Sequence, residues 1–395
     1  MQYRIDKKSG NQLSIMGFGC MRFPRNLTQI DVNRSEQLIV KAVQEGINYF
    51  DTAYAYGGSE IALGQILAKN NLRSKIFLAT KLPYTKCKSY NDFESFFQIQ
   101  LNRLQTDYID YYLIHNISDT KAWEKLCELG IEKWIKEKKE SGQIRNIGFS
   151  FHGIHDEFLK LLDIYEWDFC QIQYNYVNIH YQAGTAGLKK AAEKGLPVII
   201  MEPLLGGKLA TGLHRKAVKL FNEANNSLSP AAWALRWLWN HKEVTVVLSG
   251  MNSMEQLEDN LKTSKNAAPD MLTITEKDTY ESVIKIIEAT YKVPCTGCNY
   301  CMPCPHNVNI PACFTAYNVS YATGLVTGIT LYVTSTGLMN SEKNTAASKC
   351  KECGTCEKKC PQQIPIAKSL KKVRKKMEPF WLKAALAVYL KLNMT

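Results

Sequence analysis

Short runs of apolar residues alternate, over the first two thirds of the chain, with longer segments in which apolar residues recur every three or four positions. The short runs are rich in Ile, Val, Tyr and Phe, as buried parallel strands are, and the longer segments have the spacing of amphipathic helices. The eight runs are SIMGFG (14–19), INYFDTA (47–53), IFLATKL (76–82), YIDYYLIH (108–115), IRNIGFS (144–150), FCQIQYN (169–175), PVIIMEP (197–203) and VTVVLSG (244–250). Eight strand–helix units over about 250 residues predict a (β/α)8 barrel of the α/β class.

The pattern changes after Tyr291, where the alternation stops and cysteine, proline and glycine become frequent. A chain of 395 residues, 45% of them hydrophobic, is long enough for one barrel-sized core and a smaller appendage. We therefore predict a barrel (1–270), a linker helix (271–292), a small, mostly helical cysteine-rich domain (293–366) and a basic C-terminal tail (367–395).

Three shorter segments complete this prediction. YRIDKKSGNQLSI (3–15) is compatible with a hairpin that closes the bottom of the barrel. Residues 305–349 lie between two groups of cysteines and are too many for a simple loop, so they predict helices of their own. In the tail, KSLKKVRKK (368–376) leads into EPFWLKAALAVYLKL (378–392), an amphipathic segment suited to docking on the protein or on a membrane surface.

Hydropathy makes a cytoplasmic location the expectation. There is no apolar run of about eighteen residues and no apolar segment near the N-terminus, so neither a transmembrane helix nor a signal peptide is expected. The formal charge of +12 is compatible with anionic cofactors, an acidic partner protein or a generic basic surface. No arginine-rich or aromatic-interleaved pattern indicates nucleic acid binding.

Eight of the thirteen cysteines fall into two tight runs. The second run, CKECGTCEKKCP (350–361), has the C-x2-C-x2-C-x3-C-P spacing of bacterial [4Fe-4S] proteins. The first run, CTGCNYCMPCP (295–305), follows this spacing except for a last step that is one residue shorter. Paired zinc sites are the alternative, but two runs of three cysteines plus a Cys-Pro match tetrahedral zinc poorly.

In such paired runs, three cysteines hold one cluster and the fourth ligates the other cluster. We therefore predict two [4Fe-4S] clusters with crossed ligation. Their ligands would be Cys295, Cys298, Cys301 and Cys360 for one cluster, and Cys350, Cys353, Cys356 and Cys304 for the other. The region resembles dicluster ferredoxin domains of the helical kind. Cys313 belongs to neither set and is expected to be buried. Two clusters of charge about −2 would lower the net charge to roughly +8.

Four ionisable residues stand at or just after the ends of successive predicted strands: Asp51, Tyr56, Lys81 and His115. In (β/α)8 barrels the carboxyl ends of the strands meet at one mouth, where catalysis takes place. A tyrosine donates a proton to a carbonyl oxygen more readily when a nearby ammonium lowers its pKa. The aspartate would hold that lysine, and the histidine would orient the carbonyl. Each residue alone is more often structural, whereas four suitable types in order indicate carbonyl reduction.

The residues GFGCMRFP (17–24), GINYFDTAYAYG (46–57), the lysine of ATKLP, the histidine of YIDYYLIHN and GQIRNIGFS (142–150) resemble the aldo-keto reductase family over roughly residues 1 to 265. The resemblance implies that Asp51, Tyr56, Lys81 and His115 form the catalytic tetrad. It also implies a nicotinamide cofactor bound without a Rossmann domain, with hydride transfer to the carbonyl carbon and Tyr56 as general acid.

The same resemblance implies a set of cofactor contacts: Gly19, Met21, Arg22, Ser150, Gln171, Glu202, Leu204, Gly206, Gly250, Asn252, Gln256 and Asn260. Phe151 stands where the family usually has an asparagine, and Glu202 where many members stack a tyrosine on the nicotinamide. Gln256 replaces an arginine that often holds the 2′-phosphate, so NADH is as plausible as NADPH. Gly206 and Gly207 suit either a pyrophosphate contact or a plain turn.

The combination of a hydride site with a one-electron relay leads to three hypotheses. The first is a reductase of carbonyl or related small molecules whose clusters exchange electrons with a ferredoxin-like partner. The second is an ordinary NAD(P)H-dependent reductase in which the clusters are structural or redox-sensing. The third is a non-catalytic nicotinamide-binding barrel. A flavin would split electron pairs into single electrons, and one in the barrel mouth is compatible with Phe151 and Glu202, although no flavin motif is present.

Overall fold

The computed structural model describes residues 1–338 and 344–382. The chain forms two compact units. The first unit comprises Met1–Leu205 and Asn226–Ile274, and the second comprises Gly206–Asn225 and Thr275–Thr395.

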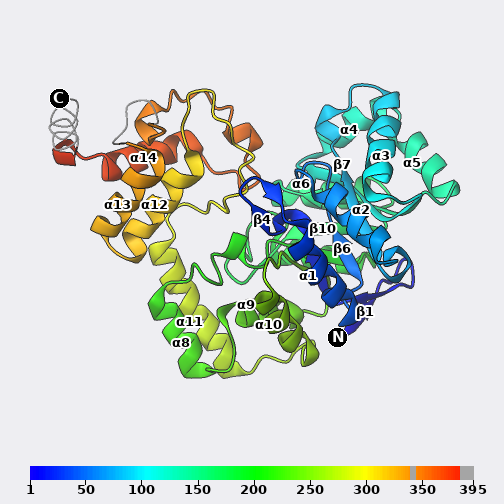
Figure 1. Cartoon of the computed structure of the whole chain (residues 1–395), viewed down its shortest axis with the longest axis horizontal. Coiled ribbons are helices and arrows are strands. Elements are labelled where there is room, and N and C mark those ends of the chain that lie inside the picture. Colours follow the sequence, from blue (N-terminus) through cyan, green and yellow to red (C-terminus); the bar gives the residue numbers. More distant parts are fainter. Residues whose placement is uncertain (339–343, 383–395) are drawn as a thin grey trace. The chain divides into compact units, whose positions relative to one another are not determined.

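The first unit contains a closed barrel of eight parallel strands (Figure 1). The strands follow one another around the barrel in chain order, which confirms the predicted fold class. They are β3 (Met16–Gly19), β6 (Tyr49–Asp51), β7 (Phe77–Leu82), β8 (Ile109–Ile117), β9 (Ile144–Phe151), β10 (Phe169–Gln173), β11 (Val198–Met201) and β12 (Val244–Ser249). Each of the eight predicted runs coincides with one of these strands, and only β8 and β9 extend one or two residues beyond the predicted ends.

Helices lie between the strands along the chain and around the outside of the barrel (Figure 1). Their starts follow ordinary capping chemistry: Asp31 accepts a hydrogen bond from the backbone of Arg34, and Ser229 caps the helix that begins at Pro230. The helices of this unit are α1 (Val32–Gln44), α2 (Ser59–Lys69), α3 (Tyr90–Leu104), α4 (Thr120–Glu128), α5 (Ile131–Glu140), α6 (His155–Ile164), α7 (Gly184–Glu193), α9 (Pro230–Trp239) and α10 (Met254–Lys265).

Side chains alternate between the two faces of each barrel strand. A buried cluster fills the interior, and its members come from alternate positions of several strands, including Tyr49, Ala79, Leu113, Phe169 and Ile199. The residue two positions further along each of these strands therefore also faces inward, but at the carboxyl end of the barrel. This parity decides which strand-end side chains reach the mouth.

A two-stranded hairpin closes the other end of the barrel, as predicted. It pairs β1 (Tyr3–Ile5) with β2 (Gln12–Ser14). Leu13 joins the interior cluster, and the hydroxyl of Tyr111 in β8 donates a hydrogen bond of 2.8 Å to Asp6 Oδ2. Asn11 Nδ2 donates to the same hydroxyl at 3.0 Å. The hairpin is thus fixed to the barrel by both apolar and polar contacts.

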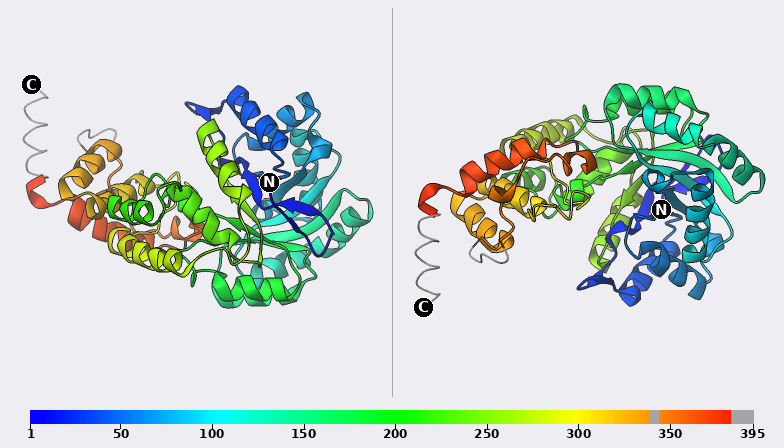
Figure 2. Two further views of the ribbon diagram at one scale, coloured as in Figure 1. Left: turned by 90° about the horizontal axis from the view of Figure 1, so that it is seen from below. Right: turned by 90° about the horizontal axis from the view of Figure 1, so that it is seen from above.

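The second unit is mostly helical. It contains α8 (Arg215–Ala224), α11 (Ile274–Thr290), α12 (Ile310–Ala322), α13 (Leu325–Thr336) and α14 (Ile366–Met377). Helices α12, α13 and α14 pack beside one another (Figure 2). Their shared core includes Phe314, Tyr332 and Val373. Helices α12 and α13 are the ones predicted within residues 305–349.

One segment lies in a different unit from the one that the sequence predicted. Residues 206–225 fall inside the predicted barrel (1–270), yet the structure groups them with the second unit. The physical reason is a contact between α8 and α11, in which the rings of Phe221 and Tyr280 meet with their centroids 5.8 Å apart. Local periodicity identifies such a helix without identifying its packing partner.

The C-terminal tail begins with the basic helix α14. The amphipathic segment predicted for residues 378–392 lies largely outside the described residues, which end at Leu382. Within the described part of the chain, no helix combines the length and apolarity needed to cross a membrane.

We expect Tyr111→Phe to destabilise the first unit, because the buried carboxylate of Asp6 would lose a hydrogen bond in a place with little access to water. The expected loss is about 1–3 kcal/mol in the free energy of unfolding. Urea unfolding followed by tryptophan fluorescence measures it, since six of the seven tryptophans lie in the first unit. Tyr108→Phe removes a hydroxyl from the same strand region and is the control. An equal effect of both substitutions would contradict the role of the hairpin contact.

Candidate functional site

The four residues of the predicted tetrad lie at the carboxyl end of the barrel. Asp51, Lys81 and His115 each follow an interior residue of the same strand by two positions, so all three face inward. Tyr56 lies in the loop between β6 and α2. The structure therefore brings together side chains that are up to 64 positions apart in the sequence.

Lys81 is the centre of this group. Its Nζ donates hydrogen bonds to Asp51 Oδ1 at 2.6 Å and to the carbonyl oxygen of Thr52 at 2.7 Å. The same Nζ lies 5.0 Å from the centroid of the Tyr56 ring. The rings of Tyr56 and His115 meet edge to face, with centroids 5.8 Å apart. Tyrosine thus has an ammonium on one side and an imidazole on another.

Burial sets the electrostatics of these groups. The Lys81 side chain is only 1% exposed, and this burial lowers its pKa, while the adjacent carboxylate of Asp51 opposes the shift. Burial also holds the pKa of His115 well below its usual value, and the positive charge of Lys81 adds to the effect. His115 is therefore neutral near pH 7 and presents an imidazole N–H that can donate to a carbonyl oxygen.

Two predicted cofactor contacts lie side by side at the same level of the barrel. Ser150 in β9 and Gln171 in β10 are direct partners in the parallel ladder. The Ser150 hydroxyl oxygen accepts a hydrogen bond of 2.7 Å from the backbone of Asn116, and Gln171 Nε2 donates to Asp51 Oδ2 at 3.0 Å. Neither of these two bonds uses the serine hydrogen or the glutamine carbonyl oxygen. One donor beside one acceptor suits a carboxamide.

Another group of predicted contacts lies where β3 and β12 are paired. Gly19 is the ladder partner of Asp51, and Met21 and Arg22 belong to the short helix η1 (Cys20–Arg22) that follows it. A Cβ atom placed on Gly250 would lie 3.3 Å from the side chain of Arg22, so the arginine packs directly on that glycine. Glycine at this position keeps the arginine close to the barrel end.

The other predicted contacts have local structural partners. Gln256 Oε1 accepts a hydrogen bond from the backbone of Asn252, and Asn260 Nδ2 donates to Ser249 Oγ. Gln256 thus fixes the first turn of α10 to the preceding loop, and Asn260 fixes the middle of α10 to the end of β12. Glu202 has a positive φ of 55°, which is unusual for a residue with a side chain, and Gly206 has a φ of 67°. Leu204 lies between them, and the boundary between the two units falls just before Gly206.

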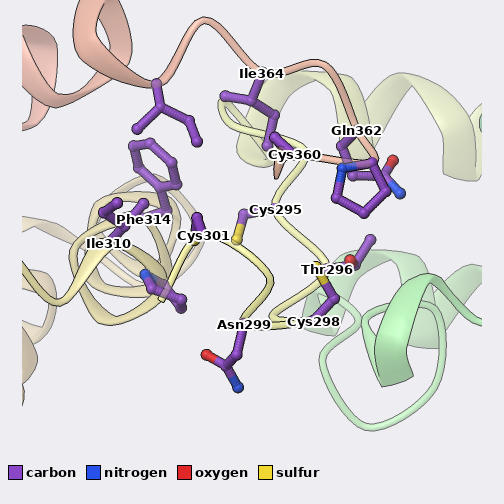
Figure 3. A pocket seen from close by; sticks show the side chains of 13 residues that line it. Cys295, Thr296, Cys298, Asn299, Cys301, Ile310, Phe314, Cys360, Gln362 and Ile364 are labelled. Carbon is purple, nitrogen blue, oxygen red and sulfur yellow. The ribbon is translucent and has the colours of Figure 1, made fainter. Parts of the chain in front are cut away.

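Four cysteines from two distant segments line one pocket of the second unit. They are Cys295, Cys298, Cys301 and Cys360, and Figure 3 shows them with their neighbours. The pocket has an empty volume of about 320 Å³, part of it open to solvent, and apolar side chains such as Ile310 and Phe314 form its wall. Burial raises the pKa of Cys301 to about 12, and the three other thiols add to the shift.

Three of the remaining four cysteines lie close enough to influence one another. Burial raises the pKa of Cys356 to about 11, with further contributions from Glu357 and from the nearby thiols of Cys304 and Cys350. Cys304 belongs to the first run, so this run also contributes a thiol to the neighbourhood of the second. Cys353 is exposed, whereas the other seven cysteines of the two runs are partly buried.

Comparison with known proteins agrees with both halves of this description. The model of the aldo/keto reductase family matches residues 15–277, and a model for a 4Fe-4S dicluster domain matches residues 294–365. The chain belongs to the aldo/keto reductase family. At its C-terminal end this family member also contains a dicluster-type domain.

Individual relatives support the same assignment. An aldo-keto reductase from Mycolicibacterium vanbaalenii is 29% identical over 256 residues, which cover 64% of this chain and 82% of the relative. The protein named aldo-keto reductase yakc [NADP(+)] from Schizosaccharomyces pombe is 23% identical over 294 residues. That match covers 64% of this chain and 85% of the relative. Among solved structures, the holo form of aldo-keto reductase AKR11C1 from Bacillus halodurans has a TM-score of 0.59 at 25% identity, covering 72% of this chain and 96% of that one.

The cysteine pocket of this reductase contains a buried hydroxyl that a bound cluster would satisfy. Among residues 1–338 and 344–382, no three Cys, His, Asp or Glu side chains converge as one metal ion would require. Thr296, which also lines the pocket, is 4% exposed, and its hydroxyl has no hydrogen-bond partner among the described residues. A cluster sulfur would give that hydroxyl an acceptor.

Sequence reasoning missed two polar residues near the barrel mouth. His152 follows Ser150 by two positions, and its Nδ1 lies 3.1 Å from Gln182 Oε1. Burial lowers the pKa of His152 to about 4, and His152 in turn influences His115. Gln173 is fully buried, and its side-chain amide has no partner among the described residues. Both residues follow a predicted cofactor contact by two positions, Ser150 in one case and Gln171 in the other, so the alternation of side chains along a strand could have identified them.

Stability of the first unit should depend on pH through His152. An unfolded histidine takes up a proton below about pH 6.5, whereas His152 in the folded protein does so only near pH 4. Folding stability is therefore lost progressively as the pH falls from about 6.5 to about 4. We expect His152→Asn, which keeps a donor toward Gln182, to reduce the loss between pH 7 and pH 5 by about 1–2 kcal/mol.

Urea unfolding at both pH values, followed by tryptophan fluorescence, makes this measurement. His180→Asn at an exposed position is the matched control and should leave the pH dependence unchanged. Identical pH dependence in the wild type and His152→Asn would show that His152 does not carry the effect.

Proposed function

We propose that this protein is an iron–sulfur oxidoreductase of the aldo-keto reductase type that works in the cytoplasm. Its barrel reduces the carbonyl group of a small molecule, or a related substrate, with Tyr56 as general acid. Its second unit carries single electrons on two [4Fe-4S] clusters and exchanges them with a ferredoxin-like protein. The observation that carries the proposal is the contact of the Lys81 ammonium with both Asp51 and the ring of Tyr56 at the carboxyl end of the barrel.

Each residue of the tetrad has a defined task in this reaction. Tyr56 donates its phenolic proton to the substrate oxygen as negative charge develops there. The ammonium of Lys81 stabilises the phenolate that remains, and Asp51 keeps that ammonium in place. His115, neutral and with a donor N–H, holds the carbonyl oxygen near Tyr56. A bound nicotinamide would supply the hydride to the carbonyl carbon.

Ser150 and Gln171 would hold the carboxamide of that nicotinamide through their remaining donor and acceptor. We propose that the other predicted contacts bind the rest of the dinucleotide. They extend from Gly19, Met21 and Arg22 to the start of α10. The proposal covers both NADPH and NADH. The name of the Schizosaccharomyces pombe relative includes NADP(+), which favours NADPH. Gln256 has no positive charge to offer a 2′-phosphate, which favours NADH.

For the clusters we propose crossed ligation. Cys295, Cys298, Cys301 and Cys360 share one pocket, which supports their assignment to one cluster. Cys304 and Cys350 both contribute to the raised pKa of Cys356, which supports the second set. Cys353 would complete that set. In both sets the fourth cysteine comes from the other run, so each cluster would link the two segments of the unit.

Tyr56→Phe should lower kcat for the reduction of small aldehydes by about 100- to 10,000-fold, because the general acid is lost. Binding of NADPH, measured by quenching of tryptophan fluorescence, should stay unchanged. Tyr54→Phe is the control, since Tyr54 packs edge to face on Phe96 and takes no part in the tetrad. Wild-type protein that binds the cofactor but reduces no carbonyl compound would instead favour the non-catalytic barrel.

Single cysteine substitutions should divide into two groups. Cys301→Ser and Cys360→Ser should alter the same signal in electron paramagnetic resonance of the anaerobically reduced protein, and Cys304→Ser and Cys353→Ser should alter the other signal. Loss of one cluster should remove about half of the iron. If Cys301→Ser and Cys304→Ser instead removed the same signal, crossed ligation would be wrong. If NAD(P)H-driven turnover survived Cys353→Ser combined with Cys356→Ser, the clusters would serve a structural or sensing role.

A further inference from the structure

The surface around Cys353 in the second unit combines an exposed cysteine with a high density of positive charge. Cys353 is the exposed member of the two cysteine runs. Electron transfer between proteins slows steeply with distance, so a partner must dock where a cluster comes nearest to the surface. Under the ligation proposed above, this place is the cluster held by Cys350, Cys353 and Cys356.

Two polar contacts bring α14 beside this part of the chain. Lys371 Nζ forms an ion pair of 2.7 Å with Glu352, and the backbone of Ala367 donates a hydrogen bond of 2.8 Å to Glu357 Oε1. Both α14 residues belong to the first half of that helix. The first half of α14 and the second cysteine run therefore share one surface.

This surface has a strong excess of positive charge. Residues 350–377 contain nine Lys or Arg residues but only two acidic residues, Glu352 and Glu357, and both of these are engaged by α14. The apolar stripe of α14 is buried in the core of the unit, and the exposed lysines of the helix are Lys368, Lys371, Lys372 and Lys375. We call the following exposed residues, together with Cys353, the cationic port: Lys351, Lys358, Lys359, Lys368 and Lys372.

We propose that the cationic port docks an acidic one-electron carrier protein, such as a small iron–sulfur or flavin protein with a negatively charged surface. This inference rests on the proposed electron-carrying function of the clusters. In the transfer step one electron would pass from the reduced carrier to the cluster that Cys350, Cys353 and Cys356 would hold, with no bond made or broken. The surrounding lysines attract the carrier and stabilise the additional negative charge on the cluster.

The position of the port favours a protein partner over a lipid surface. The exposed aromatic residues of the tail, Phe380 and Trp381, follow the C-terminal end of α14. The contacts that connect α14 with the cysteine run lie toward its other end, at Ala367 and Lys371. Lys351, Lys358 and Lys359 thus flank the predicted cluster ligands and lie more than twenty positions along the chain from the aromatic pair.

The test uses the full chain with both clusters assembled anaerobically. A reduced, acidic bacterial ferredoxin is mixed with it in a stopped-flow instrument, and cluster reduction is followed by the loss of visible absorbance. For the double variant K358E/K372E we expect the second-order rate constant at low ionic strength to fall about tenfold or more. Its dependence on salt should also become weaker.

The matched control is K277E/K285E, which reverses two exposed lysines on α11 in the same unit. It should change the rate by no more than about twofold. Dithionite, a small donor that needs no docking surface, should reduce the clusters of every variant at similar rates. If K358E/K372E fails to assemble its clusters, the neutral variant K358Q/K372Q replaces it and should show a smaller decrease in the same direction.

Three outcomes would overturn the proposal. The first is an equal rate with ferredoxin for the wild type and the port variants. The second is an equal decrease for port and control variants. The third is cosedimentation of the wild type with phosphatidylglycerol-containing vesicles that is lost in K358E/K372E, which would assign the port to a lipid surface.

Failure of docking and failure of the proposed function can be told apart. Clusters reduced by dithionite are tested separately for their effect on carbonyl turnover in the barrel. If this turnover responds to cluster reduction while ferredoxin reduces no cluster, the docking proposal is wrong and the function stands. If ferredoxin reduces the clusters through the port but turnover does not respond, the port stands and the coupled function is wrong.

Discussion

The buried ion pair between Lys81 and Asp51 organises the side chains at the carboxyl end of the barrel. Both side chains are almost completely buried, and neither charge would be stable there alone. Loss of one partner from such a pair typically costs about 3–5 kcal/mol, because the remaining charge is buried without compensation. The pair also sets the positions of its neighbours: Asp51 accepts from Gln171, and Lys81 lies against Tyr56. The ion pair thereby fixes the surroundings of Tyr56, the candidate proton donor.

The pair forms because eight parallel strands direct alternate side chains toward one axis. The layer of Tyr49, Ala79, Leu113 and Phe169 fills the barrel with apolar groups. The next layer consists of Asp51, Lys81, His115 and Gln171, two residues further along the same strands. The polar layer therefore packs directly on the apolar layer, which keeps water from reaching the polar side chains through the interior of the barrel. Burial accordingly lowers the pKa values of both Lys81 and His115.

Most of this arrangement follows from the sequence, because strand parity is a local property. The runs that end in Asp51 and His115 could be identified from apolar spacing alone, and barrel geometry then brought their ends together. Contacts between distant segments could not be identified in this way. The ring contact of Phe221 with Tyr280 groups residues 206–225 with the second unit, and no periodicity within either helix specifies it. The ion pair between Glu352 and Lys371 is a further example.

The distribution of charge changes how the overall basicity is interpreted. Residues 350–377 contribute nine positive and two negative side chains, so this short segment supplies more than half of the formal charge of +12. The rest of the chain, with 40 basic and 35 acidic residues, is close to neutral for its length. A generic basic surface would spread the excess evenly. Its concentration in the segment that contains the exposed Cys353 places most of the excess positive charge beside the proposed point of electron entry, where it would attract an acidic partner before contact.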